Sequence, residues 1–487
     1  MRWYDKPFFR RFSPQQIGLF LLLGYAILPL WFPLAPYHHV FPQYDIRRFT
    51  PSLGGGLLYG LWLVLMSGAC WLVYRRVQMM AQPPRLRWFA AASGLFCLLL
   101  VWVYPINATD VYRYFIRGRV TSLYQANPFV TTPAAFPDDP YFILAGEWAD
   151  YTSPYGPVWE GVAGLVTWLF PDHLLAGLVT FKVIGAAAFL GSGLLLWGLL
   201  VDWPPGARLG RTLLWLWNPA LLLIFVADGH NDGLMLFWLL LGVWLWRRGR
   251  VHLAWLVLPL APLTKLIGLL ALPFIFLGMW RTVTPGPMSR LSAERVKLFL
   301  VALFASVGLF FLAFLPFGSP FALLYRLVQE SRGGAGFSPL TLVYFLGEFL
   351  GVDVTVAQLA DMGSWLFVLL AGVLLWWTWR GRDSFRSVTD IFAGYVVQAL
   401  SFRLWYAAWL FPWTLVDPTE RRLRVGFLFL LTTQLSVLIY GHLNASVLGN
   451  MALAHLIGIP FTFILPLLLA GYGSPHTPHL ETPQTEK

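Results

Sequence analysis

The sequence predicts an all-α polytopic membrane protein. Hydrophobic residues make up 58% of the 487 residues and charged residues only 12%, a balance that no soluble domain could bury. Apolar runs of about twenty residues, the length that a helix needs to cross a bilayer, recur from end to end. The runs are continuous and rich in Leu, Trp and Phe, without the alternating polarity of barrel strands, so we expect helices.

The net charge of +11 reflects membrane topology rather than nucleic-acid binding. Basic residues gather in short clusters where apolar runs end, which is typical of cytoplasmic loops. We therefore place the following clusters in the cytoplasm: Arg2 to Arg11, Arg75 to Arg87, Arg247 to Arg250, Arg281 to Lys297, Arg380 to Arg386 and Arg421 to Arg424.

The first spans lead to a large outer loop. Spans near residues 16–35 and 56–74 return the chain to the cytoplasm, and a third near 87–105 delivers it to the outer face. We expect the following loop, residues 106–156, to be exoplasmic and to hold the active site. Residues 157–170 would break the parity of crossings, so we interpret them as an interfacial or re-entrant helix.

Three later polar segments reach the same face. The helix at 231–247 ends at a cytoplasmic cluster, so Gly229-His-Asn-Asp232 begins it outside. About thirty residues separate Arg250 from Arg281, enough for two short legs that turn near Pro259 to Lys265. Lys265 should point outward yet remain deep, where a lysine needs an anionic partner. Arg403 and Tyr406 follow the same pattern.

The whole chain is expected to make about 12–14 crossings with both termini cytoplasmic. The loop 317–340, with Arg326 and Arg332, falls on the outer face. We divide the chain into N-terminal helices (1–86), a catalytic core (87–416), C-terminal helices (417–472) and a disordered cytoplasmic tail (473–487).

An outward-facing carboxylate near buried cations and aromatic rings suits transfer of a sugar from a polyprenyl phosphate. The carboxylate would deprotonate the acceptor hydroxyl, and Lys and Arg would stabilise the leaving phosphate. Aromatic rings would support the sugar and the lipid. The leaving group stays on its lipid, so no cofactor is expected.

The order of motifs resembles the GT-C integral-membrane glycosyltransferases, and in particular the bacterial polyprenyl-phosphate-mannose-dependent α-mannosyltransferases. The resemblance covers roughly residues 87–416. It rests on Asp110-Val-Tyr-Arg-Tyr with Gly118, Asn127-Pro-Phe, Ser153-Pro-Tyr-Gly-Pro, Trp217-Asn-Pro, Gly229-His-Asn-Asp232, Thr264-Lys265 and Trp405-Tyr406 with Trp409.

The resemblance implies a GT-C-like bundle in which Asp110 is the catalytic carboxylate. It also implies a polyprenyl-phosphate sugar donor, inverting transfer and no dependence on a soluble metal cofactor. Some GT-C families carry two adjacent acidic residues here, whereas Thr109 and Val111 flank Asp110 in this chain. The candidate substrate-binding residues are Tyr112, Arg113, Tyr155, His230, Asn231, Asp232, Lys265, Arg326, Arg332, Arg403 and Tyr406.

These features predict an enzyme of cell-envelope glycolipid biosynthesis in the bacterial cytoplasmic membrane. Its expected partners are a polyprenyl-phosphate hexose, most readily mannose, a lipid-linked or glycan acceptor, and membrane lipids. A secondary transporter is a further alternative, but it should show two related halves and polar groups reachable from both faces, whereas the polar residues here favour one face. Another lipid-linked glycan enzyme, a ligase or polymerase, would share the one-sided polar face and stays an alternative.

Most candidates also have a simpler interpretation. Asp110 could cap the helix that begins at Val111, and His230 to Asp232 could cap the helix after them. Lys265 could snorkel to an interface, and Arg403 could pair with Asp390 or Glu348. The remaining loop charges could be solvated or could contact lipid headgroups: Arg113, Arg117, Arg119, Asp138, Asp139, Glu147, Asp150, Arg326 and Arg332.

Overall fold

A computed structural model describes residues 12–283, 293–331 and 336–471 of the chain. These residues form helices and connecting loops, and their β-structure is limited to one isolated bridge between Pro33 and Val103. The prediction of an all-α membrane protein is therefore confirmed.

Seven helical stretches in the described part are long and apolar enough to cross a membrane. An eighth is a pair bent by 41°, formed by α9 (Pro205–Leu216) with α10 (Pro219–Leu222) and its π-helical extension η5 (Leu223–Ala227). The seven are α1 (Pro14–Trp31), α4 (Leu53–Val77), α8 (Leu174–Leu199), α15 with η8 (Ala293–Phe314 and Leu315–Phe317), α18 (Val356–Trp379), α21 with η10 (Glu420–Leu438 and Ile439–Leu448) and α22 with α23 (Met451–Phe463 and Leu465–Gly471).

The other expected crossings fall on shorter helices. Breaks in the chain divide several apolar runs into pieces too short to span a bilayer alone, so the total of 12–14 crossings stays a prediction. These shorter helices are α5 (Leu86–Leu100), α11 (Asp232–Arg247), α12 (Val251–Val257), α13 (Leu260–Thr264), η6 (Leu266–Leu270), α14 (Leu272–Val283), α17 (Pro339–Leu350), α19 (Ser384–Gln398), η9 (Leu404–Trp409) and α20 (Phe411–Val416).

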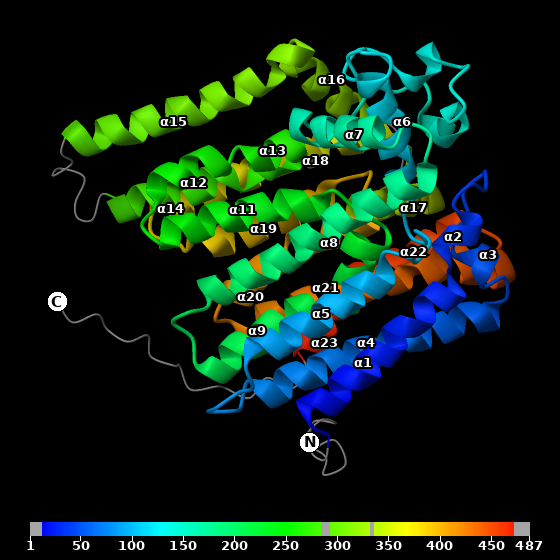
Figure 1. Ribbon diagram of the computed structural model, residues 1–487, viewed down its shortest axis with the longest axis horizontal. Coiled ribbons are helices and arrows are strands. Elements are labelled where there is room, and N and C mark those ends of the chain that lie inside the picture. The colour runs from blue at the N-terminus through cyan, green and yellow to red at the C-terminus, as the bar shows by residue number, and fades with distance from the viewer. Residues whose placement is uncertain (1–11, 284–292, 332–335, 472–487) are drawn as a thin grey trace.

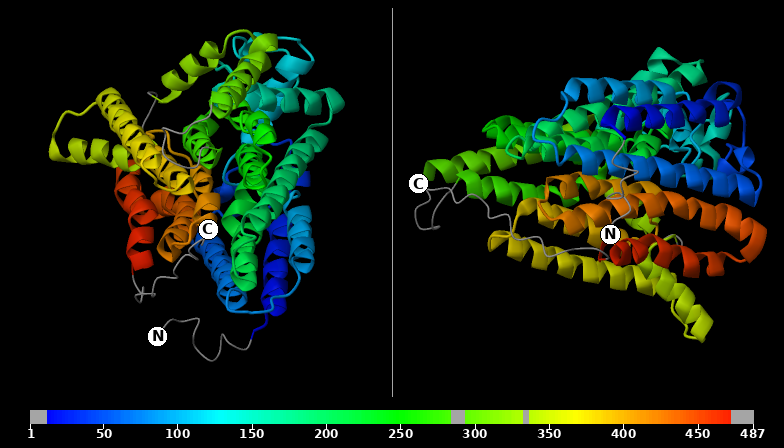
Figure 2. Two further views of the ribbon diagram at one scale, coloured as in Figure 1. Left: turned by 90° about the vertical axis from the view of Figure 1, so that its left-hand side faces the viewer. Right: turned by 90° about the horizontal axis from the view of Figure 1, so that it is seen from below.

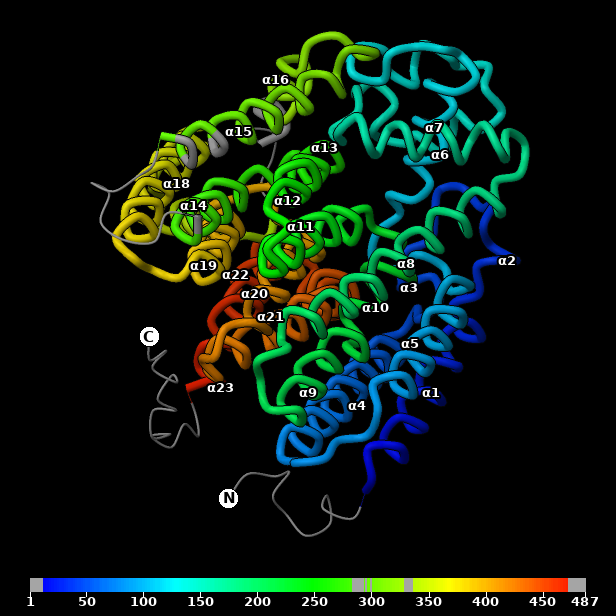
Figure 3. The backbone as a smooth tube through the Cα atoms, turned by 60° about the vertical axis from the view of Figure 1, so that its left-hand side comes forward, coloured from blue at the N-terminus to red at the C-terminus, as the bar shows by residue number. Residues whose placement is uncertain are grey.

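Helices α1, α4, α5 and α8 run side by side, and the outer-loop elements lie beyond one end of them (Figure 1). Further views show α15 and α18 on the flank away from α1 (Figures 2 and 3). The predicted outer loop folds into α6 (Asp110–Ser122), η3 (Pro133–Ala135) and η4 (Phe142–Trp148), and the predicted interfacial helix is α7 (Pro157–Leu169). Two short helices, α2 (Leu34–Tyr37) and α3 (Ile46–Phe49), connect α1 to α4, and α16 (Pro320–Ser331) follows η8.

The turn predicted near Pro259 is present. The backbone of Lys265 is extended, with φ −150° and ψ 120°, between the end of α13 and the start of η6. The amide of Gly156 donates a hydrogen bond of 3.1 Å to the carbonyl oxygen of Thr264. A Cβ on Gly156 would lie 2.1 Å from the Leu263 oxygen, so only glycine permits this contact. Lys265 is thereby fixed beside the outer loop.

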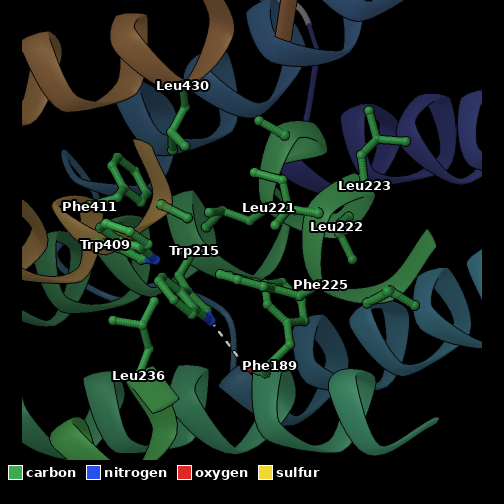
Figure 4. Packing of buried hydrophobic residues seen from close by; sticks show 14 of the residues in the cluster. Phe189, Trp215, Leu221, Leu222, Leu223, Phe225, Leu236, Trp409, Phe411 and Leu430 are labelled. Atoms are coloured by element: carbon green, nitrogen blue, oxygen red, sulfur yellow. Dashed lines mark hydrogen bonds between the residues drawn. The ribbon is translucent and has the colours of Figure 1, made fainter. Parts of the chain in front are cut away.

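Buried aromatic and aliphatic side chains from several helices pack into one hydrophobic core (Figure 4). Trp215 lies beside Phe189 and donates a 3.0 Å hydrogen bond from Nε1 to the Phe189 oxygen. Trp409 at the end of η9 and Phe411 at the start of α20 belong to the same core. Burial of these two large rings holds the junction of η9 and α20 in one position.

Candidate active site

One cavity of about 520 Å³ collects polar residues from three distant parts of the sequence. Its walls come from the outer loop, from the turn after α13 and from the segment around η9, and Leu327 and Phe337 add apolar contacts. Six of the residues predicted from sequence line it, namely Asp110, Arg113, Tyr155, Lys265, Arg403 and Tyr406.

Asp110 is the buried carboxylate of the cavity wall and is 7% exposed. The hydroxyl of Tyr155 donates a 3.0 Å hydrogen bond to its Oδ1, and Arg113 lies 3.4 Å from the same oxygen. Burial raises the pKa of Asp110, but the charges of Arg113, His230 and Lys265 and the Tyr155 hydrogen bond outweigh it, so the pKa lies below its ordinary value. The carboxylate is ionised at neutral pH.

Helix capping does not account for Asp110. The cap position of α6 is Thr109, which makes no side-chain capping bond, and Asp110 is the first helical residue. Its oxygens contact Tyr155 and Arg113 instead. The capping interpretation is therefore wrong.

The segment His230 to Asp232 lies directly behind this wall. Asp232 is 0% exposed and accepts hydrogen bonds from Lys265 Nζ at 2.8 Å and from Trp409 Nε1 at 2.6 Å. His230 stands between the two carboxylates, with Nε2 3.9 Å from Asp110 Oδ2 and Nδ1 3.6 Å from Asp232 Oδ2. Asn231 occupies the cap position of α11 without a side-chain capping bond. Capping therefore does not explain this motif either.

A buried lysine joins this turn to the beginning of the outer loop. Lys182 of α8 donates hydrogen bonds to the carbonyl oxygens of Val103 and Ala227. Asp228 accepts a 3.4 Å bond from the amide of Asn107. Gly229 has φ +70°, a conformation that favours glycine. These contacts hold two segments about 120 residues apart in register.

Lys265 meets the anionic partner that its depth requires. Its side chain is 16% exposed and is paired with Asp232, and its ammonium lies 5.9 to 6.0 Å from the ring centres of Tyr155, Trp405 and Trp409. Snorkelling is excluded, because the amine points into the protein's own cavity. Trp405 and Trp409 belong to the motif on which the resemblance rests and were not among the predicted site residues, yet both line the cavity.

Arg403 is an exposed cation that makes no ion pair within the described part of the chain. The predicted alternative, a pair with Asp390, is wrong because Asp390 is paired with Arg382 and Arg422. Tyr406 stacks on Trp409 with ring centres 4.1 Å apart.

Three candidates lie away from the cavity or outside the described residues. Tyr112 is buried with its ring 6.2 Å from that of Tyr104. Helical spacing turns it to the face opposite Asp110 and Arg113. The prediction that Tyr112 lies in the site is therefore wrong. Arg326 packs over the Tyr151 ring at 4.6 Å and does not line the cavity. Arg332 lies outside the described residues.

Some charged residues of the outer loop lie in surroundings other than those predicted. Asp139 is buried and bonded to Arg119 at 2.8 Å, so its solvated interpretation is wrong. Asp138, Glu147 and Asp150 are exposed as expected. Arg117 lines the cavity although it is buried, and Glu160 is buried in α7. Asp110, Arg113 and Arg117 are spaced along one helical face, and this spacing could have placed Arg117 in the site from the sequence.

Within the described part of the chain, no group of three or more His, Cys, Asp or Glu side chains is arranged to hold a metal ion. That the reaction does not depend on a soluble metal cofactor stays a prediction.

The model of the alpha-(1->6)-mannopyranosyltransferase family, N-terminal domain, matches residues 39–281. The chain belongs to this family. The match includes Asp110, Asp232 and Lys265 and ends before Arg403. This agrees with the resemblance that the motifs indicate.

Curated relatives carry the same family description. Alpha-(1->6)-mannopyranosyltransferase A of Mycobacterium tuberculosis is 24% identical over 66% of this chain and 63% of its own length. The Corynebacterium glutamicum proteins A and B are 23% and 24% identical, over 37% and 47% of this chain and 36% and 40% of their own lengths. The matched part thus spans from about a third to under two thirds of these relatives. No solved structure matches the chain.

Proposed function

We propose that the protein is an inverting mannosyltransferase that transfers mannose from a polyprenyl-phosphate donor to a hydroxyl group of a glycan or glycolipid acceptor. We place the reaction at the exoplasmic face of the bacterial cytoplasmic membrane. The observation that carries the proposal is the buried carboxyl group of Asp110 in a cavity wall that also contains Lys265, Arg113 and Arg403.

Asp110 has the surroundings that a general base needs. Tyr155 and Arg113 fix its Oδ1, which directs the carboxylate without capping the helix. Its lowered pKa makes it a weak base that is always ionised, so the acceptor proton would move late, when the acceptor oxygen has already begun to bond to the sugar. Asp232 is a poorer candidate because Lys265 and Trp409 occupy its oxygens.

The cations of the cavity suit the leaving phosphate. Arg113, Arg117, Lys265 and Arg403 all line it, and charge develops on a phosphate oxygen as the bond to the sugar breaks. The stacked rings of Tyr406 and Trp409 offer an apolar face of the kind that packs against a pyranose. The apolar residues Leu266, Ile267 and Leu270 on another wall suit the first isoprene units of the lipid.

A single displacement is favoured over a double one. Besides Asp110, the other carboxylate among the residues that line the cavity is Glu147, which is 75% exposed at the rim and lies 3.5 Å from Arg113. A one-step transfer inverts the anomeric centre, so a β-linked donor would give an α product. The names of the relatives support mannose and an α-(1→6) linkage.

Release of polyprenyl phosphate from synthetic polyprenyl-phospho-mannose by purified protein tests the proposal, with membrane glycolipids as acceptors. We expect turnover by the wild type and a loss of about 10²- to 10⁴-fold in Asp110→Asn, the usual contribution of a general base. Asp138→Asn, an exposed loop carboxylate, is the matched control and should retain full turnover. Retention of the anomeric configuration would contradict inversion, and an active Asp110→Asn would place the base elsewhere.

A further inference from the structure

Two buried charged side chains lie at the edge of the cavity, and one of them, Glu160, has no role in the proposed transfer. Arg117 of α6 and Glu160 in the first turn of α7 are 3% and 1% exposed. Within the described residues, one terminal nitrogen of Arg117 and one carboxyl oxygen of Glu160 have no hydrogen-bond partner. Burying either charge is costly unless another group compensates it, so the pair requires an explanation.

The two residues come from helices that touch backbone to backbone. A Cβ on Gly118, which follows Arg117, would lie 2.3 Å from the carbonyl oxygen of Ala163, one helical turn after Glu160. Arg117 also borders the cavity, with its guanidinium 5.8 Å from the Tyr155 ring centre. Arg117 therefore lies between the ligand space and the helix that carries Glu160, and the charges of the two side chains act on each other without a direct ion pair.

The second carboxyl oxygen of Glu160 is used inside the protein. It accepts a hydrogen bond from the Ser153 hydroxyl, and the Ser153 oxygen accepts one of 3.1 Å from the amide of Tyr155. Tyr155 in turn holds Asp110. A substitution at Glu160 must keep this acceptor if it is to test charge alone.

The charge on Glu160 changes near neutral pH. Burial raises the pKa of its carboxyl to about 7, against the opposing effects of the Ser153 hydrogen bond and the Arg117 charge. Arg117 of α6 is the charged group that acts on Glu160. Tyr155, Glu160, Arg113 and Asp110 act on Arg117.

We propose that Glu160 controls how tightly the cavity binds the phosphodiester of the donor, an inference that rests on the proposed function. An ionised Glu160 competes with the donor phosphate for Arg117. A protonated Glu160 leaves Arg117 to the phosphate. A phosphodiester keeps one negative charge throughout this pH range, so donor binding at neutral pH should take up a proton.

The test compares the KM for synthetic polyprenyl-phospho-mannose at pH 6 and pH 8 in the purified full chain, with saturating acceptor. The wild-type KM should rise about tenfold, the scale of ordinary coupling between sites. Glu160→Gln keeps an oxygen for Ser153 but cannot ionise, so its KM should stay at the lower value. Asp138→Asn should retain the wild-type dependence.

A second variant tests the inference independently, in case Glu160→Gln does not fold. Arg117→Gln removes the group for which phosphate and carboxylate compete, so its KM should be high at both pH values. A wild-type KM that does not change with pH, or a dependence that persists in Glu160→Gln, would overturn the inference and leave the transferase proposal intact. A wild type without turnover on any polyprenyl-phospho-sugar would instead remove the proposed function on which the inference rests.

Discussion

Charged residues gather in two regions of the protein, and the two differ in how their charges are compensated. The first is the cavity cluster, formed by Asp110, Arg113, Asp232, Lys265 and Arg403. The second is the ion-pair cluster, where the ends of α18 and α20 meet the starts of α19 and α21; it consists of Arg382, Arg386, Asp390, Asp417 and Arg422.

In the ion-pair cluster every cation has an acidic partner. Arg386 lies 3.0 Å from Asp417, and Arg422 lies 2.8 Å from Asp390. In the cavity cluster Arg403 faces open space without an ion pair in the described chain. A charge compensated by its neighbours stabilises the fold, whereas one left facing a cavity is available to a ligand. Composition alone cannot distinguish the two.

Lys265→Met should have the largest effect, because this lysine has both roles. Its loss leaves Asp232 buried without a counter-ion, which costs about 3–5 kcal/mol in comparable pairs, and removes a cation from the cavity. We expect a lower melting temperature and a raised donor KM. The double variant Lys265→Met with Asp232→Leu should recover stability but not donor binding; recovery of both would reduce Lys265 to a structural residue.

Arg403→Gln should separate binding from stability. The side chain is exposed and unpaired within the described residues, so the melting temperature should change little. The donor KM should rise about tenfold, as expected for a lost hydrogen bond to a charged group. An unchanged KM in a transfer assay would remove Arg403 from the site.

Arg386→Gln should give the smallest effect and the opposite pattern. Asp417 is buried but keeps the amide of Thr419 at 2.7 Å and Arg422 at 3.7 Å. We expect a loss of about 1 kcal/mol in the free energy of unfolding and an unchanged donor KM. A raised KM here would show that the two clusters are coupled and would weaken the contrast between them.

Much of the site followed from the sequence because membrane topology limits where polar residues can lie. Parity placed Asp110, His230 and Lys265 on one face, and the structure brings these three together around a single cavity wall. Predictions made for single residues, without such a constraint, were less accurate. Asp139 appears as a loop charge in the sequence, yet it is buried against Arg119. Tyr112 lies on the face of α6 that packs against Tyr104 and not on the face that lines the cavity.

The sequence by itself determined the all-α membrane class, the breaks near Pro259 and Arg403, and the set of polar segments, because hydrophobic run length and helix-breaking residues act locally. Only the tertiary structure decided which partners those residues have. Trp409 reaches Asp232 across 177 positions, and α6, which carries Arg117, meets α7, which carries Glu160, at Gly118. Such contacts depend on the packing of distant helices, which no local pattern encodes.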